Sequence, residues 1–133
     1  DAVLAVFGAP RRNDDDPDRA VRCALVMQEA MGGINAANSA DGLPEVEMAI
    51  ALNTGAVVAG NIGSERRSKY GFVGHAMNVT SRIEDVADPG EILISQTTYE
   101  KLGGNYQFGQ SQALSVKGIE AELRVHAVLG EDQ

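Results

Sequence analysis

Residues 69–84 read KYGFVGHAMNVTSRIE, and the rest of the chain is best interpreted outward from this stretch. Its first residues alternate aromatic with small side chains, the pattern breaks at Gly74, and apolar side chains then recur at helical spacing. That order predicts a strand, a tight turn and a helix. A helical wheel of about 100° per residue places Val79, Ile83 and Val86 in one stripe, which we expect to be buried.

Two polar side chains share another face of the same predicted helix. Asn78 and Arg82 are one turn apart, so they lie one above the other. The apolar stripe begins roughly 40° beyond them on the wheel, which places the pair where packed core gives way to a cleft. An amide beside a permanent cation suits an oxyanion or a phosphate. The alternative is that Arg82 is a solvated surface charge and Asn78 a local cap.

Residues 70–82 resemble the signature of class III adenylate and guanylate cyclase catalytic domains, and so do further blocks along the chain. These blocks are DAVLAVFG at 1–8, NTG at 53–55, GNIGS at 60–64, PGEILIS at 89–95 and VKG at 116–118. They occur in the family's order and span nearly the whole sequence. The resemblance implies an α+β fold, namely a ferredoxin-like α/β sandwich with a mostly antiparallel sheet and flanking helices.

The size and charge of the chain limit the number of domains and the class of protein that it can form. Its 133 residues and 14.0 kDa suit one domain, residues 1–133, with a single core. By resemblance, that domain lacks the family's N-terminal strand, helix and strand. The net charge of −8, with a basic cluster only at residues 66–69, argues against nucleic-acid binding.

The compartment is inferred from what the sequence lacks. No apolar run approaches the roughly 20 residues of a membrane span, so we expect no direct membrane contact from this domain, although a parent protein could be anchored. Cys23 is the single cysteine, which excludes an intrachain disulfide and favours a cytoplasmic setting. We expect Cys23 to pack within the first helix.

Local patterns predict the remaining elements. Asp14, Asp15 and Asp16 precede Pro17, which indicates a capped helix start rather than a metal site. Interleaved strands and helices favour an α+β sandwich over a doubly wound sheet. The predicted elements are a strand at 2–7, a helix at about 16–36, a long hairpin of strands 46–52 and 56–62, a strand at 91–95, a helix at 97–102, and strands at 106–108, 114–117 and 123–128.

The resemblance implies a reaction and assigns residues to it. Cyclisation of a nucleoside triphosphate is an in-line attack of the ribose 3′-hydroxyl on the α-phosphate, with loss of pyrophosphate. By resemblance, Arg82 stabilises the transition state, Asn78 orients the ribose and Lys117 binds the terminal phosphates. A surface lysine at a strand end is the alternative for Lys117.

The resemblance also implies metals and a base site. Two Mg²⁺ or Mn²⁺ ions are expected, and Asp1 matches one of the family's metal-binding aspartates; a frayed terminal residue is the alternative for Asp1. Gly71 and Phe72 occupy the substrate-binding position for the base. Gly71 stands where relatives often carry a base-reading side chain, so the choice of base stays open. His75, where the family usually has Asp, is interpreted as an altered helix cap.

The expected function is a nucleotidyl cyclase of intracellular signalling that converts ATP, or less favourably GTP, to the cyclic nucleotide. In this family the metal carboxylates come from one subunit and the Asn/Arg pair from the other, so we expect a two-fold homodimer. The alternative is an inactive cyclase-homology module that binds nucleotide or dimerises to regulate a neighbouring domain. An unrelated ferredoxin-like binding domain is disfavoured because it leaves Asn78, Arg82 and Lys117 unexplained.

Overall fold

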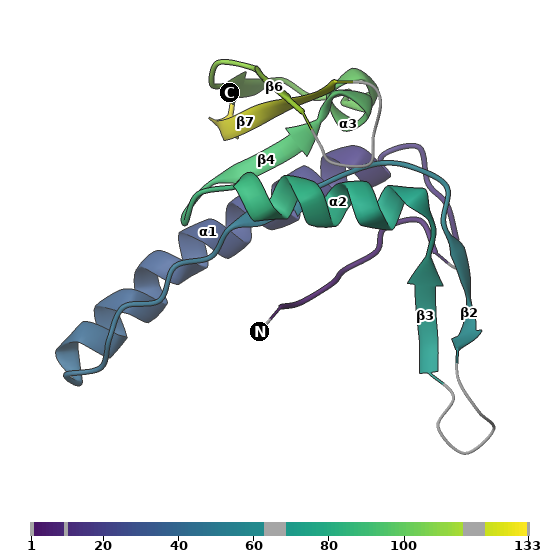
Figure 1. Ribbon diagram of the computed structural model, residues 1–133. Helices are drawn as coiled ribbons and strands as arrows, with labels where there is room; N and C mark the ends of the chain where they lie inside the picture. The colour runs from purple at the N-terminus through teal and green to yellow at the C-terminus, as the bar shows by residue number, and fades with distance from the viewer. Residues whose placement is uncertain (1, 10, 63–68, 116–121, 133) are drawn as a thin grey trace.

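The chain folds into a mixed sheet with helices on both faces and a separate two-stranded hairpin (Figure 1). A computed structural model describes residues 2–9, 11–62, 69–115 and 122–132. The elements are α1 (Asp16–Ala40), β1 (Ile50–Leu52), β2 (Val58–Ile62), β3 (Lys69–Val73), α2 (His75–Val86), β4 (Ile92–Ser95), α3 (Gln96–Lys101), β5 (Tyr106–Phe108), β6 (Gln112–Leu114) and β7 (Leu123–Glu131).

Strand β7 organises the sheet, because β4, β5 and β6 all pair with it antiparallel. Strand β1 pairs parallel with β4, with Ile50 opposite Ile92. A parallel pair needs a long crossover connection, and here the hairpin and α2 provide it. The prediction of an α+β fold with a mostly antiparallel sheet and flanking helices is therefore confirmed.

The two faces of β4 build two apolar clusters. Ile92 and Ile94 belong to the cluster that includes Val21 and Ala24 of α1. Leu93, between them, belongs to the cluster that α2 completes. Successive side chains of a strand point to opposite faces, so a strand covered on both faces is apolar throughout. Strand β4 thus fixes α1 and α2 on opposite sides of the sheet.

Helix α1 begins as predicted and ends later than predicted. Asp15 is the cap residue, but its side chain makes no capping bond; instead Asp16 Oδ2 accepts a hydrogen bond from Asn13 N at 2.8 Å. The helix continues to Ala40, one turn beyond residue 36. Cys23 lies exposed on its outer face, 3.9 Å from Met27 in the sulfur-to-sulfur distance. The expectation that Cys23 is packed is therefore wrong.

The predicted hairpin of strands 46–52 and 56–62 is also wrong. Strand β1 pairs with β4, whereas β2 pairs antiparallel with β3, with Val58 opposite Val73 and Gly60 opposite Gly71. Alternation identifies a strand but does not specify its partner. The apolar β1 finds a buried partner in β4, some forty residues later in the chain.

The two ends of the chain also differ from the prediction. Residues 2–7 form no strand, and Val3 and Leu4 are 86% and 57% exposed. A strand needs a neighbouring backbone for its hydrogen bonds, and no described strand pairs with this segment (Figure 1). Strand β6 ends at Leu114, so the strand predicted at 114–117 is displaced toward the N-terminus, and residues 116 and 117 lie outside the described ranges.

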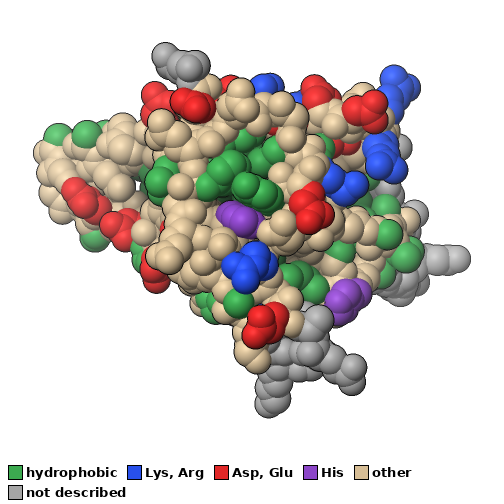
Figure 2. Space-filling view, turned by 90° about the horizontal axis from the view of Figure 1, so that it is seen from above, with side chains coloured by type: hydrophobic (Ala, Val, Ile, Leu, Met, Phe, Trp, Pro, Cys, Tyr) green, Lys and Arg blue, Asp and Glu red, His purple; other side chains and the backbone are tan. Residues whose placement is uncertain are grey.

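The surface is mixed in character. Viewed from above, hydrophobic side chains gather near the centre of one face, and acidic and basic side chains are scattered over the rest of it (Figure 2). None of the helices in the described part of the chain combines the length and the hydropathy of a membrane-spanning segment.

Candidate functional site

Helix α2 carries the predicted site and begins as the sequence predicts. Gly74 is its cap residue, with φ of 146°, a conformation that side chains other than glycine rarely adopt. Val79 and Ile83 are buried against Leu93 of β4 and its neighbours, as expected for the apolar stripe. Val86 is instead 47% exposed, because it is the last residue of the helix and lies beyond the packed stripe.

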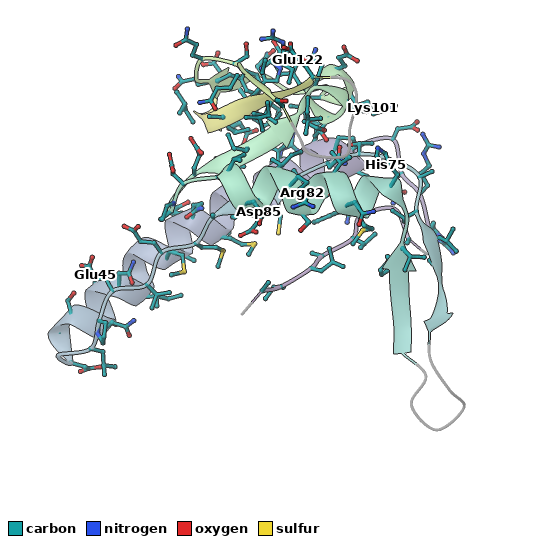
Figure 3. The ribbon with its side chains drawn as sticks, viewed as in Figure 1. Glu45, His75, Arg82, Asp85, Lys101 and Glu122 are labelled. Atoms are coloured by element: carbon teal, nitrogen blue, oxygen red, sulfur yellow. The ribbon has the colours of Figure 1, made fainter. Side chains whose placement is uncertain are left out.

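Asn78 and Arg82 lie on the exposed side of α2. Arg82 is labelled in Figure 3 on the side of the helix turned away from β4, and its side chain is 54% exposed. It approaches Asp85 at 3.7 Å, an ion pair between two half-exposed groups. Such a pair contributes roughly 0.2–1 kcal/mol, so it does not sequester the guanidinium. The Asn78 side chain is exposed and makes no hydrogen bond with the residues that the structure describes.

Strand β3 leads into this helix and carries the two predicted base-site residues. Gly71 faces Gly60 of β2, and Phe72 faces Ala59, in the register of the hairpin. Only Gly74 separates β3 from α2, so the strand end and the start of the helix stay close together. Gly71 contributes no side chain, so any base contact there has to come from its backbone. His75 is the exposed first residue of α2, and the cap residue is Gly74, so the interpretation of His75 as an altered helix cap is wrong.

Two predicted site residues cannot be placed. Asp1 and Lys117 lie outside the described ranges, so their distances from Asn78 and Arg82 are not defined. Among the described residues, no group of three acidic, histidine or cysteine side chains is arranged to hold a metal ion. The structure thus places Asn78 and Arg82 on one side of the helix that follows β3, whereas Asp1 and Lys117 lie outside the described residues.

A buried polar cluster elsewhere was not predicted. The carboxylate of Asp18 accepts hydrogen bonds from Gly103 N at 2.9 Å, from Gly104 N at 2.8 Å and from the Tyr106 hydroxyl at 2.6 Å. Burial raises the pKa of Asp18, but these hydrogen bonds and the charge of Arg22 outweigh it and hold the pKa below its ordinary value. Burial and the adjacent carboxylate raise the pKa of Tyr106 to about 12. The cluster ties α1 to the turn before β5.

The position of this cluster indicates a structural role. Asp18 is on α1, and its partners follow α3, whereas Asn78 and Arg82 are on α2 at the opposite face of the sheet. The sequence signal was present in the glycine pair 103–104 followed by Tyr106, which offers three donors. Nothing local identified Asp18 as their acceptor, because 85 residues separate it from Gly103.

Comparison with known proteins identifies the family. The model of the adenylate and guanylate cyclase catalytic domain matches residues 1–130. The chain belongs to this family. It is 31% identical over 132 residues to adenylate cyclase 1 of Rhizobium meliloti (strain 1021), which covers 98% of the chain and 20% of that protein. The chain therefore spans about a fifth of this curated relative.

Solved cyclase structures have the same fold. The guanylyl cyclase Cya2 matches with a TM-score of 0.90 and 42% identity, over 96% of this cyclase chain and 64% of that one. The adenylyl cyclase CyaB from P. aeruginosa matches with a TM-score of 0.86 and 27% identity, over 96% and 66% respectively.

Two further solved relatives have known partners. The guanylate cyclase domain of RhGC from Catenaria anguillulae, in complex with GTP, is 30% identical, with a TM-score of 0.78 over 95% of this chain and 66% of that one. The guanylyl cyclase domain of the RhoGC fusion protein from Blastocladiella emersonii, solved as a non-canonical dimer, is 26% identical, with a TM-score of 0.74 over 95% and 65%. Nucleotide binding and dimer formation thus both occur among structural relatives of this cyclase domain.

Proposed function

We propose that this domain converts a purine nucleoside triphosphate, ATP or GTP, to the 3′,5′-cyclic nucleotide and pyrophosphate. The observation that carries the proposal is the Asn78 and Arg82 pair, one turn apart on the exposed side of α2, the helix that directly follows β3. Because the chain belongs to the cyclase family, we assign this pair a role in the reaction rather than interpret Arg82 as a solvated surface charge.

The reaction requires fixed polar groups around the α-phosphate. The ribose 3′-oxygen forms a bond to the α-phosphorus and loses its proton, while the bond from that phosphorus to the pyrophosphate oxygen breaks. Negative charge grows on the phosphoryl oxygens, where the permanently charged guanidinium of Arg82 stabilises it. The amide of Asn78 holds the ribose so that the hydroxyl lies in line with the leaving group. Lys117 is proposed to bind the terminal phosphates.

Divalent metal ions are included in the proposal because membership of the cyclase family implies them, and not because the described residues form a metal site. When bound, Mg²⁺ or Mn²⁺ would activate the hydroxyl and neutralise the phosphates. Asp1 is the proposed ligand from this chain. The described residues hold no acidic cluster of their own, so the remaining ligands have to come from outside the described ranges or from a partner subunit.

A two-fold homodimer is the proposed assembly. The hairpin exposes Val58 and Val73, which are 68% and 49% accessible and directly opposite each other on β2 and β3. Exposed apolar side chains gathered at one place favour a protein interface. A symmetric pair of subunits would set the Asn78 and Arg82 of one chain against Asp1 of the other.

The proposal is tested with the full-length protein, assayed with ATP and with GTP, and with Mg²⁺ and with Mn²⁺. Arg82→Ala is expected to lower kcat by about 10²–10³-fold, as for other preorganised transition-state donors. Glu84→Ala is the matched control, because Glu84 is an exposed charge on the same helix. Both variants should keep the wild-type melting temperature.

Each outcome of this assay has a definite meaning. Formation of one cyclic nucleotide identifies the substrate, which Gly71 does not specify because it has no side chain to read the base. Equal activity of the Arg82→Ala variant and the wild type would show that Arg82 has no role in the reaction. Absence of any product with either nucleotide would support the inactive cyclase-homology module.

A further inference from the structure

The segment that joins β1 to β2 packs against the start of α2. We call residues 53–57 the clasp. The side-chain amide of Asn53 donates a hydrogen bond to the backbone oxygen of Ala76, at 3.0 Å. Gly55 packs so closely that a Cβ placed on it would lie 2.6 Å from the Cβ of Ala76. A Cβ on Gly74 would lie 3.4 Å from the backbone oxygen of Ala56. The clasp therefore contacts the cap and the first turn of α2.

The clasp is itself anchored to the sheet. Thr54 Oγ1 lies 2.8 Å from Thr98 Oγ1, which in turn lies 3.1 Å from Ser95 Oγ. Ser95 caps α3 by accepting a hydrogen bond from Thr98 N at 3.2 Å. Ser95 and Thr98 are 1% and 2% exposed, so these hydroxyl groups have no access to water as an alternative partner. The start of α2 is thus connected to the junction of β4 and α3.

Helix α2 has no side-chain cap at its N-terminus. The Ala76 oxygen there accepts a hydrogen bond from Asn53, outside the helix, and one from Thr80 Oγ1 at 2.7 Å within it. The cap residue is Gly74, which has no side chain to accept a hydrogen bond from the helix. Ala76 precedes Asn78 by two residues and Arg82 by six. A helix moves as a rigid rod over this length, so a tilt at Ala76 displaces both polar side chains together.

We propose that Asn53 is a positioning residue for the cyclase reaction, acting through α2 to set the Asn78 amide and the Arg82 guanidinium at the α-phosphate. The inference rests on the proposed function, since it assigns Asn53 to the same site. Displacing catalytic groups by about 1 Å costs up to roughly 10²-fold in rate. Removing the hydrogen bond to Ala76 also lowers the stability of the fold, so the melting temperature of each variant is measured beside its kcat to separate a positioning role from a structural one.

Asn35 provides a matched control. Its amide donates to Val46 O at 2.8 Å and its oxygen accepts from Val46 N at 2.7 Å. Like Asn53, it is a partly buried asparagine that ties a connecting segment to a helix. Its helix is α1, however, and it contacts no part of α2. Asn35→Ala therefore removes comparable bonds without disturbing the proposed site.

The experiment compares Asn53→Ala, Asn53→Asp and Asn35→Ala in the full-length protein. Asn53→Ala is expected to lower kcat about tenfold while KM for the nucleotide changes less than about twofold. Asn53→Asp keeps the size but replaces the donor with an acceptor facing a carbonyl oxygen, so its kcat should fall further. Asn35→Ala should keep wild-type kcat. A loss of kcat as large in Asn35→Ala as in Asn53→Ala would overturn the proposal.

A double variant tests whether Asn53 acts through Arg82. In an Arg82→Ala background, Asn53→Ala should lower kcat by less than about threefold, because part of what it positions is already gone. A full tenfold loss in that background would mean that Asn53 acts independently of the guanidinium, and would overturn the part of the proposal that assigns Arg82 to it.

Hydrogen exchange separates failure of this inference from failure of the proposed function. Amides of residues 75–80 should exchange faster in Asn53→Ala than in Asn35→Ala, whether or not the protein is active. If the wild type makes no cyclic nucleotide, the proposed function fails, and faster exchange still supports the clasp. Unchanged exchange overturns the clasp even in an active enzyme.

Discussion

The central sheet and the β2–β3 hairpin are built from similar apolar residues but use them differently. All four residues of β4 are buried between α1 and α2. The hairpin instead leaves Val58 and Val73 largely exposed. The sheet therefore holds the fold together from within one chain, whereas the hairpin presents apolar surface outward.

Helix α2 is where the two regions meet. Val79 and Ile83 bury one face of it against the sheet, and Asn78 and Arg82 lie exposed on another. Side chains that act on a ligand are best placed on a rigid element whose other face is packed. The following three predictions test this division between the two regions, beginning with the largest expected effect.

Truncating the core should unfold the domain, whereas truncating the hairpin should not. Ile94 is fully buried, and Ile94→Ala is expected to lower the free energy of unfolding by about 2–5 kcal/mol. Val58→Ala is the matched aliphatic truncation in the hairpin. It should change the free energy of unfolding by less than about 0.5 kcal/mol in a monomeric sample. Urea denaturation measures both. Equal losses would show that the hairpin contributes as much as the sheet.

Charging the hairpin should separate the subunits without unfolding them. Val58→Asp combined with Val73→Asp places two carboxylates opposite each other on the exposed hairpin. Buried in an interface, such charges should weaken association by at least about tenfold and lower the specific activity accordingly. Sedimentation across a concentration series, together with the activity assay, provides the measurement.

Leu129 supplies the control for the charged hairpin. It is 65% exposed on β7, so Leu129→Asp adds a carboxylate at an apolar surface position outside the hairpin. Sedimentation of this variant should match the wild type. Unchanged association of the doubly charged variant would place the subunit interface elsewhere.

The smallest predicted effect concerns the Asp18 cluster. Tyr106→Phe removes the phenol that donates to Asp18 and should cost about 1–2 kcal/mol of unfolding free energy at pH 7. Because the folded pKa of Asp18 is lowered, its contribution is complete above its ordinary pKa of 3.8 and is lost as the pH falls through the folded value. The difference between wild type and variant should therefore shrink below about pH 4.

Urea unfolding at pH 7 and at pH 3 measures this pH dependence. Tyr99→Phe is the control, since Tyr99 is 38% exposed and its hydroxyl makes no hydrogen bond with the described residues. A Tyr106→Phe effect of the same size at both pH values would show that the phenol acts through packing rather than through the carboxylate.

Local sequence patterns were sufficient to predict those elements that one short stretch of sequence specifies. The break at Gly74 and the spacing of Val79 and Ile83 predicted α2, and a continuous apolar run predicted the buried β4. The exposed placement of Asn78 and Arg82 followed from the same helical periodicity. Each of these features is specified by residues within one short stretch, so no distant contact was needed to predict it.

Pairings between distant segments were not predictable in this way. The sequence around Asn53, Thr54 and Gly55 has the composition of a turn, and we interpreted it as the bend of a hairpin. The structure instead uses it to reach Ala76 and Thr98, which lie 23 and 44 residues further along. The same limit applies to Asp18 and its donors. Hydrogen bonds over such separations leave no periodic trace in the sequence.

The exposure of Cys23 has a practical consequence for studying assembly. It is the single thiol among these 133 residues, and it stands at the surface of α1 rather than in the core. A maleimide dye would therefore label each copy of the domain at one defined point. Mixing donor- and acceptor-labelled samples would then report the encounter of two copies by energy transfer, with no engineered residue.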